Sequence, residues 1–167
     1  MKAAFEIERK FVIDRLPDGM LGQREGTRIH QGYLLLEKER ELRIRKMGQD
    51  HHSMTVKQGQ GLQRLEQECA ISSEQFDMLW PLTAGRRLVK TRYCLQQRDH
   101  LWEIDVFAAN LSPLVLLEVE FATVEQSREF AAPGFVAFEV TEDPAYKNAA
   151  LATQGLPGAP VKGRSHE

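Results

Sequence analysis

Apolar and charged residues alternate along the first stretch of the chain, from Phe5 to Ile13. Alternation with a period of two is typical of a β-strand whose two faces meet different surroundings. One face then carries apolar side chains, and the other carries Glu6, Glu8 and Lys10. Two carboxylates and an ammonium group in one row are costly to bury without partners. The pattern therefore predicts a strand whose polar face looks onto a metal ion and a polyanion.

The same alternation predicts strands along most of the remaining chain. They are expected at residues 28–36, 41–45, 53–57, 64–71, 86–96, 101–107, 114–121 and 137–141. Turns rich in Gly, Pro and Asp separate many of them, as in sheets built from hairpins. We therefore predict a mainly β (α+β) protein with an antiparallel sheet.

Three short helices are expected, two between strands and one after the last strand. Ser72 and Gln75 have the spacing of a capping box at the start of the first helix. Thr123 caps the second, and Asp143 precedes a proline at the start of the third, which is expected over residues 145–153. So few helices leave apolar strand faces uncovered, which favours a homodimer.

Composition limits the class of protein. The 167 residues are 42% hydrophobic and 28% charged, which suits one domain with a sizeable core. The net charge is −2, so the overall field favours neither nucleic acid nor a membrane as partner, and any polyanion site must be local. Because no apolar run is long enough to span a bilayer, we expect a soluble cytoplasmic protein.

The chain divides into one domain and a tail. Residues 1–154 hold the predicted strands and helices, whereas residues 155–167 are rich in Gly, Pro and polar residues and are predicted to be disordered. Cys69 and Cys94 lack the spacing of a metal motif and fall in strand-like segments. We expect both to be buried free thiols.

Like charges recur two residues apart in nearly every predicted strand. The acidic pairs are Glu6/Glu8, Glu66/Glu68, Glu103/Asp105 and Glu118/Glu120. The basic pairs are Arg43/Arg45 and Lys90/Arg92, to which Lys10 and Lys57 add. A single pair is ordinarily part of a solvated sheet face. Repeated like charges cost energy, however, unless opposite charge lies between them.

A metal–polyphosphate complex would satisfy both kinds of pair. Carboxylates are the ligands that hard divalent cations prefer, and guanidinium and ammonium groups bind phosphate. A closed antiparallel barrel brings one face of many strands around one small ligand. We therefore expect a barrel with a charged interior.

The segment Glu6–Lys10 resembles the E-x-E-x-K signature of the CYTH superfamily, also called triphosphate tunnel metalloenzymes. The charged pairs follow in the order expected for that family, with Thr55-x-Lys57 among them and Lys147 after them. The resemblance covers residues 4–152 and points most to the short bacterial inorganic triphosphatases. The segments that carry this closer likeness are residues 31–34, 79–81, 90–93 and 141–148.

The resemblance implies a fold and a set of site residues. The fold is an eight-stranded antiparallel β-barrel tunnel that holds a triphosphate. The metal ligands, for Mg²⁺ or Mn²⁺, would be Glu6, Glu8, Asp105, Glu118 and Glu120. The phosphate-binding residues would be Lys10, Arg43, Arg45, Lys57, Arg92 and Lys147, with Lys90 as a weaker candidate. Residues that orient the basic groups or help to hold a second metal ion would be Glu66, Glu68 and Glu103.

Lys10 and Tyr33 would form a catalytic dyad that assists proton transfer, by the same resemblance. A core aromatic side chain with a satisfied hydroxyl is an equally good interpretation of Tyr33.

The implied function is metal-dependent hydrolysis of inorganic triphosphate to diphosphate and phosphate. A class IV-type adenylyl cyclase or a thiamine triphosphatase on the same fold stays open as an alternative, although the sequence shows no obvious adenine site. A non-catalytic polyphosphate-binding module would be expected to lack acidic positions, and none of those expected is lost here. A barrel with a merely solvated charged face would not bind triphosphate tightly.

Overall fold

The computed structural model describes residues 7–58 and 65–158. The strands are β1 (Ile7–Val12), β2 (Thr27–Leu36), β3 (Arg40–Met47), β4 (His51–Gln58), β5 (Leu65–Ala70), β6 (Arg87–Gln97), β7 (His100–Phe107), β8 (Val115–Phe121) and β9 (Phe138–Glu139). The α-helices are α1 (Ser73–Leu79), α2 (Val124–Glu129) and α3 (Asn148–Gln154). The 3-10 helices are η1 (Trp80–Thr83), η2 (Ala109–Leu111) and η3 (Pro144–Tyr146).

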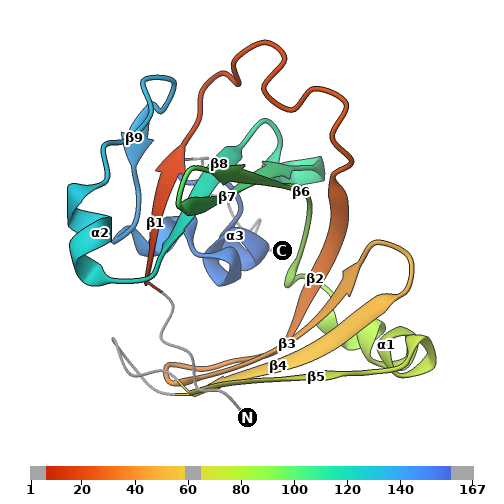
Figure 1. Cartoon of the computed structure of the whole chain (residues 1–167). Helices are drawn as coiled ribbons and strands as arrows, with labels where there is room; N and C mark the ends of the chain where they lie inside the picture. The colour runs from red at the N-terminus through yellow and green to blue at the C-terminus, as the bar shows by residue number, and fades with distance from the viewer. Residues whose placement is uncertain (1–6, 59–64, 159–167) are drawn as a thin grey trace.

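Within the described residues the strands form one sheet in the order β5-β4-β3-β2-β6-β7-β8-β1-β9, and all neighbouring strands are antiparallel. Figure 1 shows that this sheet curls, so that β1 and β8 lie opposite β3, β4 and β5. The predicted antiparallel tunnel fold is confirmed in this curled form. Hydrogen bonds do not close it into a barrel, because no ladder in the described part of the chain joins β5 to β1 or β9.

Apolar residues on the outer face of β1, β7 and β8 form a buried cluster. Phe11, Ile104 and Leu117 are almost completely buried in it. The segments that flank α2 and follow β1 cover this cluster with partly buried side chains such as Phe130 and Leu16. The alternation seen in the sequence thus separates an apolar outer face from a charged inner face.

The first helix begins as its sequence predicts. The Ser72 hydroxyl accepts a hydrogen bond from the Gln75 backbone N–H, and the Gln75 side chain accepts one from the Ser72 N–H at 2.8 Å. The predicted helix over residues 145–153 is wrong in its extent. Lys147 has an extended backbone, so the segment splits into the 3-10 turn η3 and the helix α3.

The inner face becomes apolar at one end of the curl. On five strands, the inward position two residues beyond a polar or charged side chain is apolar or aromatic. These positions are Val12, Tyr33, Leu88, Phe107 and Leu116, and they belong to one buried cluster. Leu151 and Ala152 of α3 pack into the same cluster, and Figure 1 shows α3 within the outline of the curled sheet. The interior is therefore closed at this end by hydrophobic side chains, which together form the closed-end cluster.

Other expectations meet the structure with mixed results. Cys69 and Cys94 are free thiols but are exposed, so the prediction of burial is wrong. Cys69 lies on β5, an edge strand with mostly exposed residues.

The predicted tail is partly ordered. Leu156 packs against the closed-end cluster, and residues 159–167 lie outside the described residues. Among the helices of the described segments, none has the length and apolar character needed to cross a membrane.

Candidate active site

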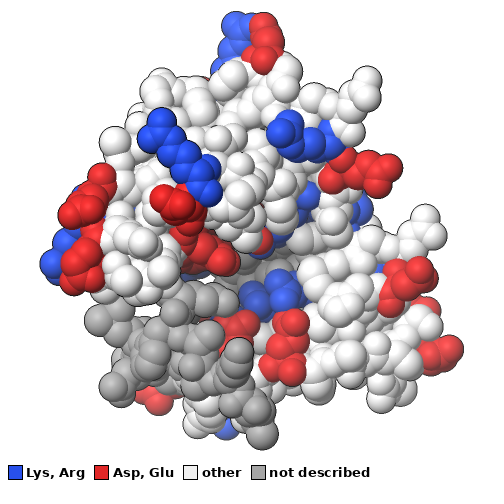
Figure 2. Space-filling model, viewed as in Figure 1, with Lys and Arg blue, Asp and Glu red and all other residues white. Residues whose placement is uncertain are grey.

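The curled sheet encloses a cavity of about 170 Å³ whose lining is almost entirely polar. Figure 2 shows the molecule hollowed near the middle of this face, with basic and acidic side chains on the walls of the hollow. Ile29 is the single apolar side chain among the described lining residues. The lining residues are Glu8, Lys10, Ile29, Gln31, Arg43, Arg45, Lys57, Glu66, Lys90, Arg92, Glu103, Glu118, Glu120 and Asn148.

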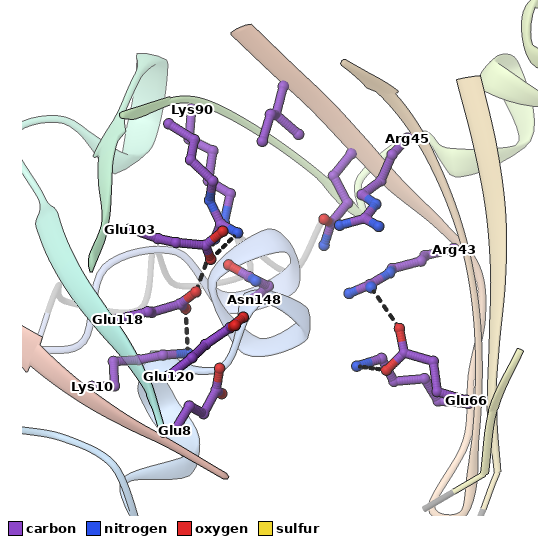
Figure 3. A pocket seen from close by; sticks show the side chains of 14 residues that line it. Glu8, Lys10, Arg43, Arg45, Glu66, Lys90, Glu103, Glu118, Glu120 and Asn148 are labelled. Carbon is purple, nitrogen blue, oxygen red and sulfur yellow. Dashed lines mark hydrogen bonds and ion pairs between the residues drawn. The ribbon is translucent and has the colours of Figure 1, made fainter. Parts of the chain in front are cut away.

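One side of the cavity is an acidic wall, which consists of Glu8, Glu103, Glu118 and Glu120 on β1, β7 and β8. Glu8 is the cross-strand partner of Glu120, and Glu103 is the partner of Glu118. Figure 3 shows these four side chains on the same side of the cavity. Like charges directly opposite one another on a sheet are destabilising, so this wall needs nearby cations.

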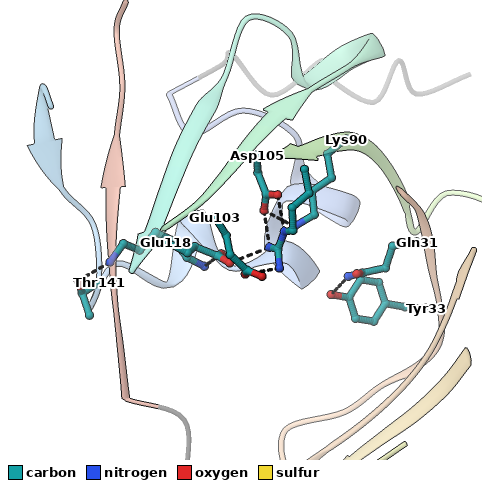
Figure 4. A network of polar contacts seen from close by, with 9 residues as sticks. Gln31, Tyr33, Lys90, Glu103, Asp105, Glu118 and Thr141 are labelled. Atoms are coloured by element: carbon teal, nitrogen blue, oxygen red, sulfur yellow. Dashed lines mark hydrogen bonds and ion pairs between the residues drawn. The ribbon is translucent and has the colours of Figure 1, made fainter. Parts of the chain in front are cut away.

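Arg92 on β6 is the main cation of the acidic wall. Its guanidinium donates to both carboxylate oxygens of Asp105 at 2.7 Å and to Glu118 at 2.8 Å, and it also pairs with Glu103. Burial alone would lower the pKa of Arg92, but Asp105 and the two glutamates outweigh it and raise that pKa. Lys90 donates to the fully buried Asp105 as well. Figure 4 shows this network.

Lys10 provides a second cation on the same wall, with its ammonium 2.9 Å from a Glu118 oxygen. Burial opposes the charged form of Lys10, but Glu118 and Glu8 raise its pKa above the ordinary value. Burial likewise opposes ionisation of Glu118, yet the neighbouring Lys90, Lys10 and Arg92 lower its pKa to about 2. Both groups are therefore charged at neutral pH.

The other side of the cavity is a basic wall, which consists of Arg43, Arg45 and Lys57 on β3 and β4. Glutamates of the edge strand β5 are its partners. Glu66 lies 3.2 Å from Arg43 and 2.7 Å from Lys57, and Glu68 lies 2.6 Å from Arg45. Figure 3 shows the basic wall across the cavity from the acidic wall.

The basic wall retains unused hydrogen-bond donors. The Nε atoms of Arg43 and Arg45 are buried and have no hydrogen-bond partner among the described residues. Burial and the neighbouring Arg43 lower the pKa of Arg45, even though Glu68 opposes this. Buried donors without partners are costly. An anion with several oxygens, such as a phosphate chain, can satisfy them.

The structure gathers most of the predicted site residues around this cavity. Glu66 and Glu103 line it, as do the predicted phosphate-binding residues Lys10, Arg43, Arg45, Lys57, Lys90 and Arg92 and the predicted metal ligands Glu8, Glu118 and Glu120. Four predicted residues of the described segments do not line it, one of which is Glu68, behind the basic wall. Asp105 and Tyr33 are buried behind the lining, and Lys147 is exposed. Lys147 contributes instead to a separate surface cavity beside Leu36. Glu6 lies outside the described residues.

Glu68 supports the basic wall from behind. Its carboxylate accepts a hydrogen bond from the Thr55 hydroxyl at 2.7 Å as well as from Arg45. Burial would raise the pKa of Glu68, but Thr55 and Arg45 together lower it. It therefore stays ionised and pairs with Arg45, although it is not part of the cavity surface. Its supporting role in the site stays a prediction.

Tyr33 is 1% exposed and belongs to the closed-end cluster. Gln31 donates a hydrogen bond to its phenolic oxygen at 2.8 Å, and burial raises the pKa of Tyr33 to about 12. No hydrogen bond or ion pair of the described residues joins Tyr33 to Lys10, and Figure 4 places Tyr33 far from Thr141, whose hydroxyl accepts from the Lys10 backbone. The interpretation of Tyr33 as a core aromatic with a satisfied hydroxyl fits this geometry; the dyad stays a prediction.

Sequence reasoning missed three lining residues. Ile29 and Gln31 share the inner face of β2 with Tyr33, and extending the alternation of that strand would have found them. Asn148 could not be found in this way, because it is one residue at the start of a short helix. Its place depends on the extended backbone of Lys147, which the sequence does not reveal.

The donor set of the acidic wall suits a hard divalent cation, since it consists of carboxylates. Within residues 7–58 and 65–158, however, no three His, Cys, Asp or Glu side chains come close enough together to hold a metal ion. Arg92 and Lys10 already engage Glu118, and Arg92 and Lys90 engage Asp105. Glu8 and Glu120 stand opposite each other on neighbouring strands and both line the cavity, so they bring two carboxylates together at one place on the wall.

Comparison with known proteins places this site in context. No protein-family model matches the chain. An inorganic triphosphatase of Nitrosomonas europaea is 48% identical over 149 residues, which cover 88% of this chain and 96% of the relative. An inorganic triphosphatase of Acetivibrio thermocellus is 32% identical over 148 residues, which cover 87% of this chain and 92% of the relative.

Solved structures agree with these relatives. The crystal structure of the inorganic triphosphatase NE1496 has a TM-score of 0.72 and 44% identity, and the match covers 92% of this chain and 98% of that chain. A putative adenylate cyclase from Bacillus halodurans has a TM-score of 0.56 at 18% identity, covers 74% of this chain and 84% of its own, and shows the fold alone. Because the curated relatives match over nearly their full length, this chain belongs to the inorganic triphosphatase family within the CYTH superfamily.

Proposed function

We propose that this protein hydrolyses inorganic triphosphate to diphosphate and phosphate inside the cavity. The observation that carries the proposal is the division of the lining into a basic wall and an acidic wall around a space closed at one end. Curated relatives that match most of the chain are named for the same activity. A small, highly charged anion suits such a cavity better than an organic ligand does.

The lining favours an inorganic substrate over a nucleotide or thiamine triphosphate. Among the described lining residues no side chain is aromatic, and Ile29 alone is apolar. A nucleobase or a thiazolium ring is usually held by apolar or aromatic surface. The described cavity therefore recognises the phosphate chain and offers little to a ring attached to it.

Arg43, Arg45 and Lys57 are the residues that bind the phosphate chain in this proposal. Their glutamate partners on β5 are partly exposed, so those ion pairs are worth little and a phosphate oxygen can take the place of Glu66. A guanidinium fork that meets two phosphate oxygens gives both affinity and orientation. Substrate binding would thereby satisfy the buried Nε donors of the two arginines.

A divalent cation, Mg²⁺ or Mn²⁺, would be held by Glu8 and Glu120, with Glu6 as the third ligand that the sequence predicts. When bound, such an ion neutralises charge on phosphate oxygens and lowers the pKa of a bound water. Asp105 is predicted to be a metal ligand, but we propose a different role for it, because Arg92 donates hydrogen bonds to both of its carboxylate oxygens. Its contribution is to hold Arg92 in place.

The reaction is an in-line displacement at a terminal phosphorus. The oxygen of a water molecule bonds to that phosphorus as the bond to the bridging oxygen breaks, and the two protons of the water end with one on each product. Arg92 and Lys10 stabilise the charge that develops on the leaving diphosphate. Glu118, 2.9 Å from the Lys10 ammonium, holds this cation in place.

Phosphate release tests the proposal directly. Inorganic triphosphate, ATP and thiamine triphosphate are compared with and without Mg²⁺ or Mn²⁺, and cyclic AMP is measured in the ATP reaction. We expect metal-dependent release from inorganic triphosphate above the other two. Cyclic AMP together with diphosphate would replace the proposal by a cyclase. If no phosphate is released from any of the three substrates but triphosphate still raises the melting temperature, the protein is a non-catalytic binding module.

The role of the carboxylates has its own test in the same assay. The double variant Glu8→Gln with Glu120→Gln is expected to lose metal-dependent turnover by about 100-fold or more while it keeps its fold. Glu125→Gln, at an exposed position of α2, is the matched control and should behave as the wild type. Undiminished turnover in the double variant would show that Glu8 and Glu120 are not needed for the reaction.

The sequence also predicts a homodimer and a cytoplasmic location, and both stay predictions.

A further inference from the structure

Asn148 is the first residue of α3, and its side chain reaches the cavity between the two walls. Figure 3 shows its amide in front of α3, with Glu118 on one side and Arg43 on the other. Residues three and four positions apart share one face of a helix. Asn148 therefore lies on the same face of α3 as Leu151 and Ala152, which seal the closed end of the interior.

The amide oxygen of Asn148 is buried and has no hydrogen-bond partner among the described residues. A buried acceptor without a donor costs about 1–3 kcal/mol, so such a group usually has a partner when the protein works. The partner must donate a hydrogen bond. A fully ionised triphosphate has only acceptor oxygens, whereas a water molecule has two O–H groups to offer.

The shape of the cavity places that water in line for attack on a phosphorus. Because the interior is closed by hydrophobic side chains beside α3, a linear triphosphate has to enter with one end leading. A water held at Asn148 then lies beyond the leading phosphorus, and the rest of the chain points toward the open side. In-line attack requires this order of water, phosphorus and leaving group.

We propose that Asn148 positions the attacking water, by accepting a hydrogen bond from it at the closed end of the cavity. The inference rests on the proposed triphosphatase function and adds the place of attack, the leading phosphorus next to α3. Water adds its oxygen there, the bond to the bridging oxygen breaks, and the diphosphate leaves toward the open side. Asn148 takes no proton; the two protons of the water end with one on each product.

The test separates binding from turnover in the intact protein. Asn148→Leu keeps much of the size of the side chain and removes its hydrogen bonds. We expect kcat for inorganic triphosphate to fall by about 10²-fold with KM little changed, because misplacing one reactant costs about that much. Affinity for an imido-bridged triphosphate analogue, which is not hydrolysed, should match the wild type by calorimetry. Asn148→Asp restores an acceptor and should recover much of kcat, with a higher KM from the added negative charge.

The other outcomes are equally clear. Weaker analogue binding and a raised KM in Asn148→Leu, with kcat unchanged, would mean that the amide donates to a phosphate oxygen, and this would overturn the proposal. Wild-type kinetics in Asn148→Leu would show that Asn148 has no role in the reaction, which would also overturn the proposal.

Asn110, the other asparagine of the chain, is exposed, and Asn110→Leu serves as the matched control. If Asn148→Leu melts early, Asn148→Ala provides the same comparison. A wild type inactive on triphosphate would instead refute the triphosphatase function itself.

Discussion

The two walls of the cavity use the same kinds of residue in different surroundings. At and behind the acidic wall, the side chains of Glu118, Asp105 and Lys90 are 7%, 0% and 3% exposed, whereas Glu8 and Glu120 of the same wall are exposed. On the basic wall, the partner side chains Glu66 and Glu68 are 27% and 37% exposed. The strands of the acidic wall are paired on both sides, whereas β5 forms the edge of the sheet in the described part of the chain.

This difference separates a fixed structure from an exchangeable one. A buried ion pair is costly to break, because removing one partner leaves an uncompensated charge away from water. A partly exposed pair contributes little to stability, because water competes for both charges. Glu118 and Asp105 thus form a rigid network that holds Arg92 and Lys10 in place. The basic wall holds its cations in weak pairs that phosphate can replace.

The largest expected effect is on stability. Arg92→Ala would leave Asp105 and Glu118 without their shared cation and should destabilise the protein by about 3–5 kcal/mol. Arg45→Ala should cost less than about 1 kcal/mol, because its partner Glu68 is partly exposed and repulsion by Arg43 is relieved. Urea unfolding at neutral pH measures both, with the exposed Arg15→Ala as control. Equal losses at Arg92 and Arg45 would erase the distinction between the walls.

A smaller effect is expected in the kinetic constants, on KM for the basic wall and on kcat for the acidic wall. Glu66→Gln removes the carboxylate that competes with phosphate for Arg43 and Lys57, so KM for inorganic triphosphate should fall severalfold. Glu118→Gln removes the partner of Lys10 and should lower kcat instead, because Lys10 is no longer held. Steady-state kinetics of the two variants side by side decide this. A raised KM in Glu66→Gln would show that Glu66 orients the cations for substrate rather than competing with it.

The smallest effects appear at the extremes of pH. Folding lowers the pKa of Glu118 from 4.5 to about 2, so its contribution to stability is present above pH 4.5 and is lost as pH falls toward 2. Folding raises the pKa of Tyr33 from 10 to about 12, so stability falls as pH rises from 10 to 12. Tyr33→Phe should cost about 1 kcal/mol at neutral pH and flatten the alkaline fall. Urea unfolding across pH measures it, and an unchanged alkaline slope would contradict the assignment to Tyr33.

The sequence predicts the strands and the charged inner face well, because both follow from a period of two. The pairs at Arg43/Arg45 and Glu118/Glu120 come to the same cavity as expected. Alternation does not reveal which charged side chains pair with one another inside the fold. Asp105 shares a face with Glu103, yet it lies one layer nearer the closed end, where Arg92 and Lys90 enclose it.

Local backbone and sheet order explain the remaining differences. The sequence predicts a continuous helix over residues 145–153, but the extended backbone at Lys147 leaves that side chain exposed and brings Asn148 to the cavity. Exposure of Cys69 follows from the place of β5 at the edge of the sheet, which depends on the order of strands. Such order is set by long-range pairing and is not encoded in a short segment.

Calorimetry with the imido-bridged triphosphate analogue tests most directly whether the two walls have separate tasks. The titrations compare the wild type, Arg43→Ala and the double variant Glu8→Gln with Glu120→Gln, each with and without Mg²⁺. We predict that Arg43→Ala weakens binding in both conditions, whereas the double variant loses only the part of the affinity that depends on Mg²⁺. Equal, metal-independent weakening in both variants would contradict the account.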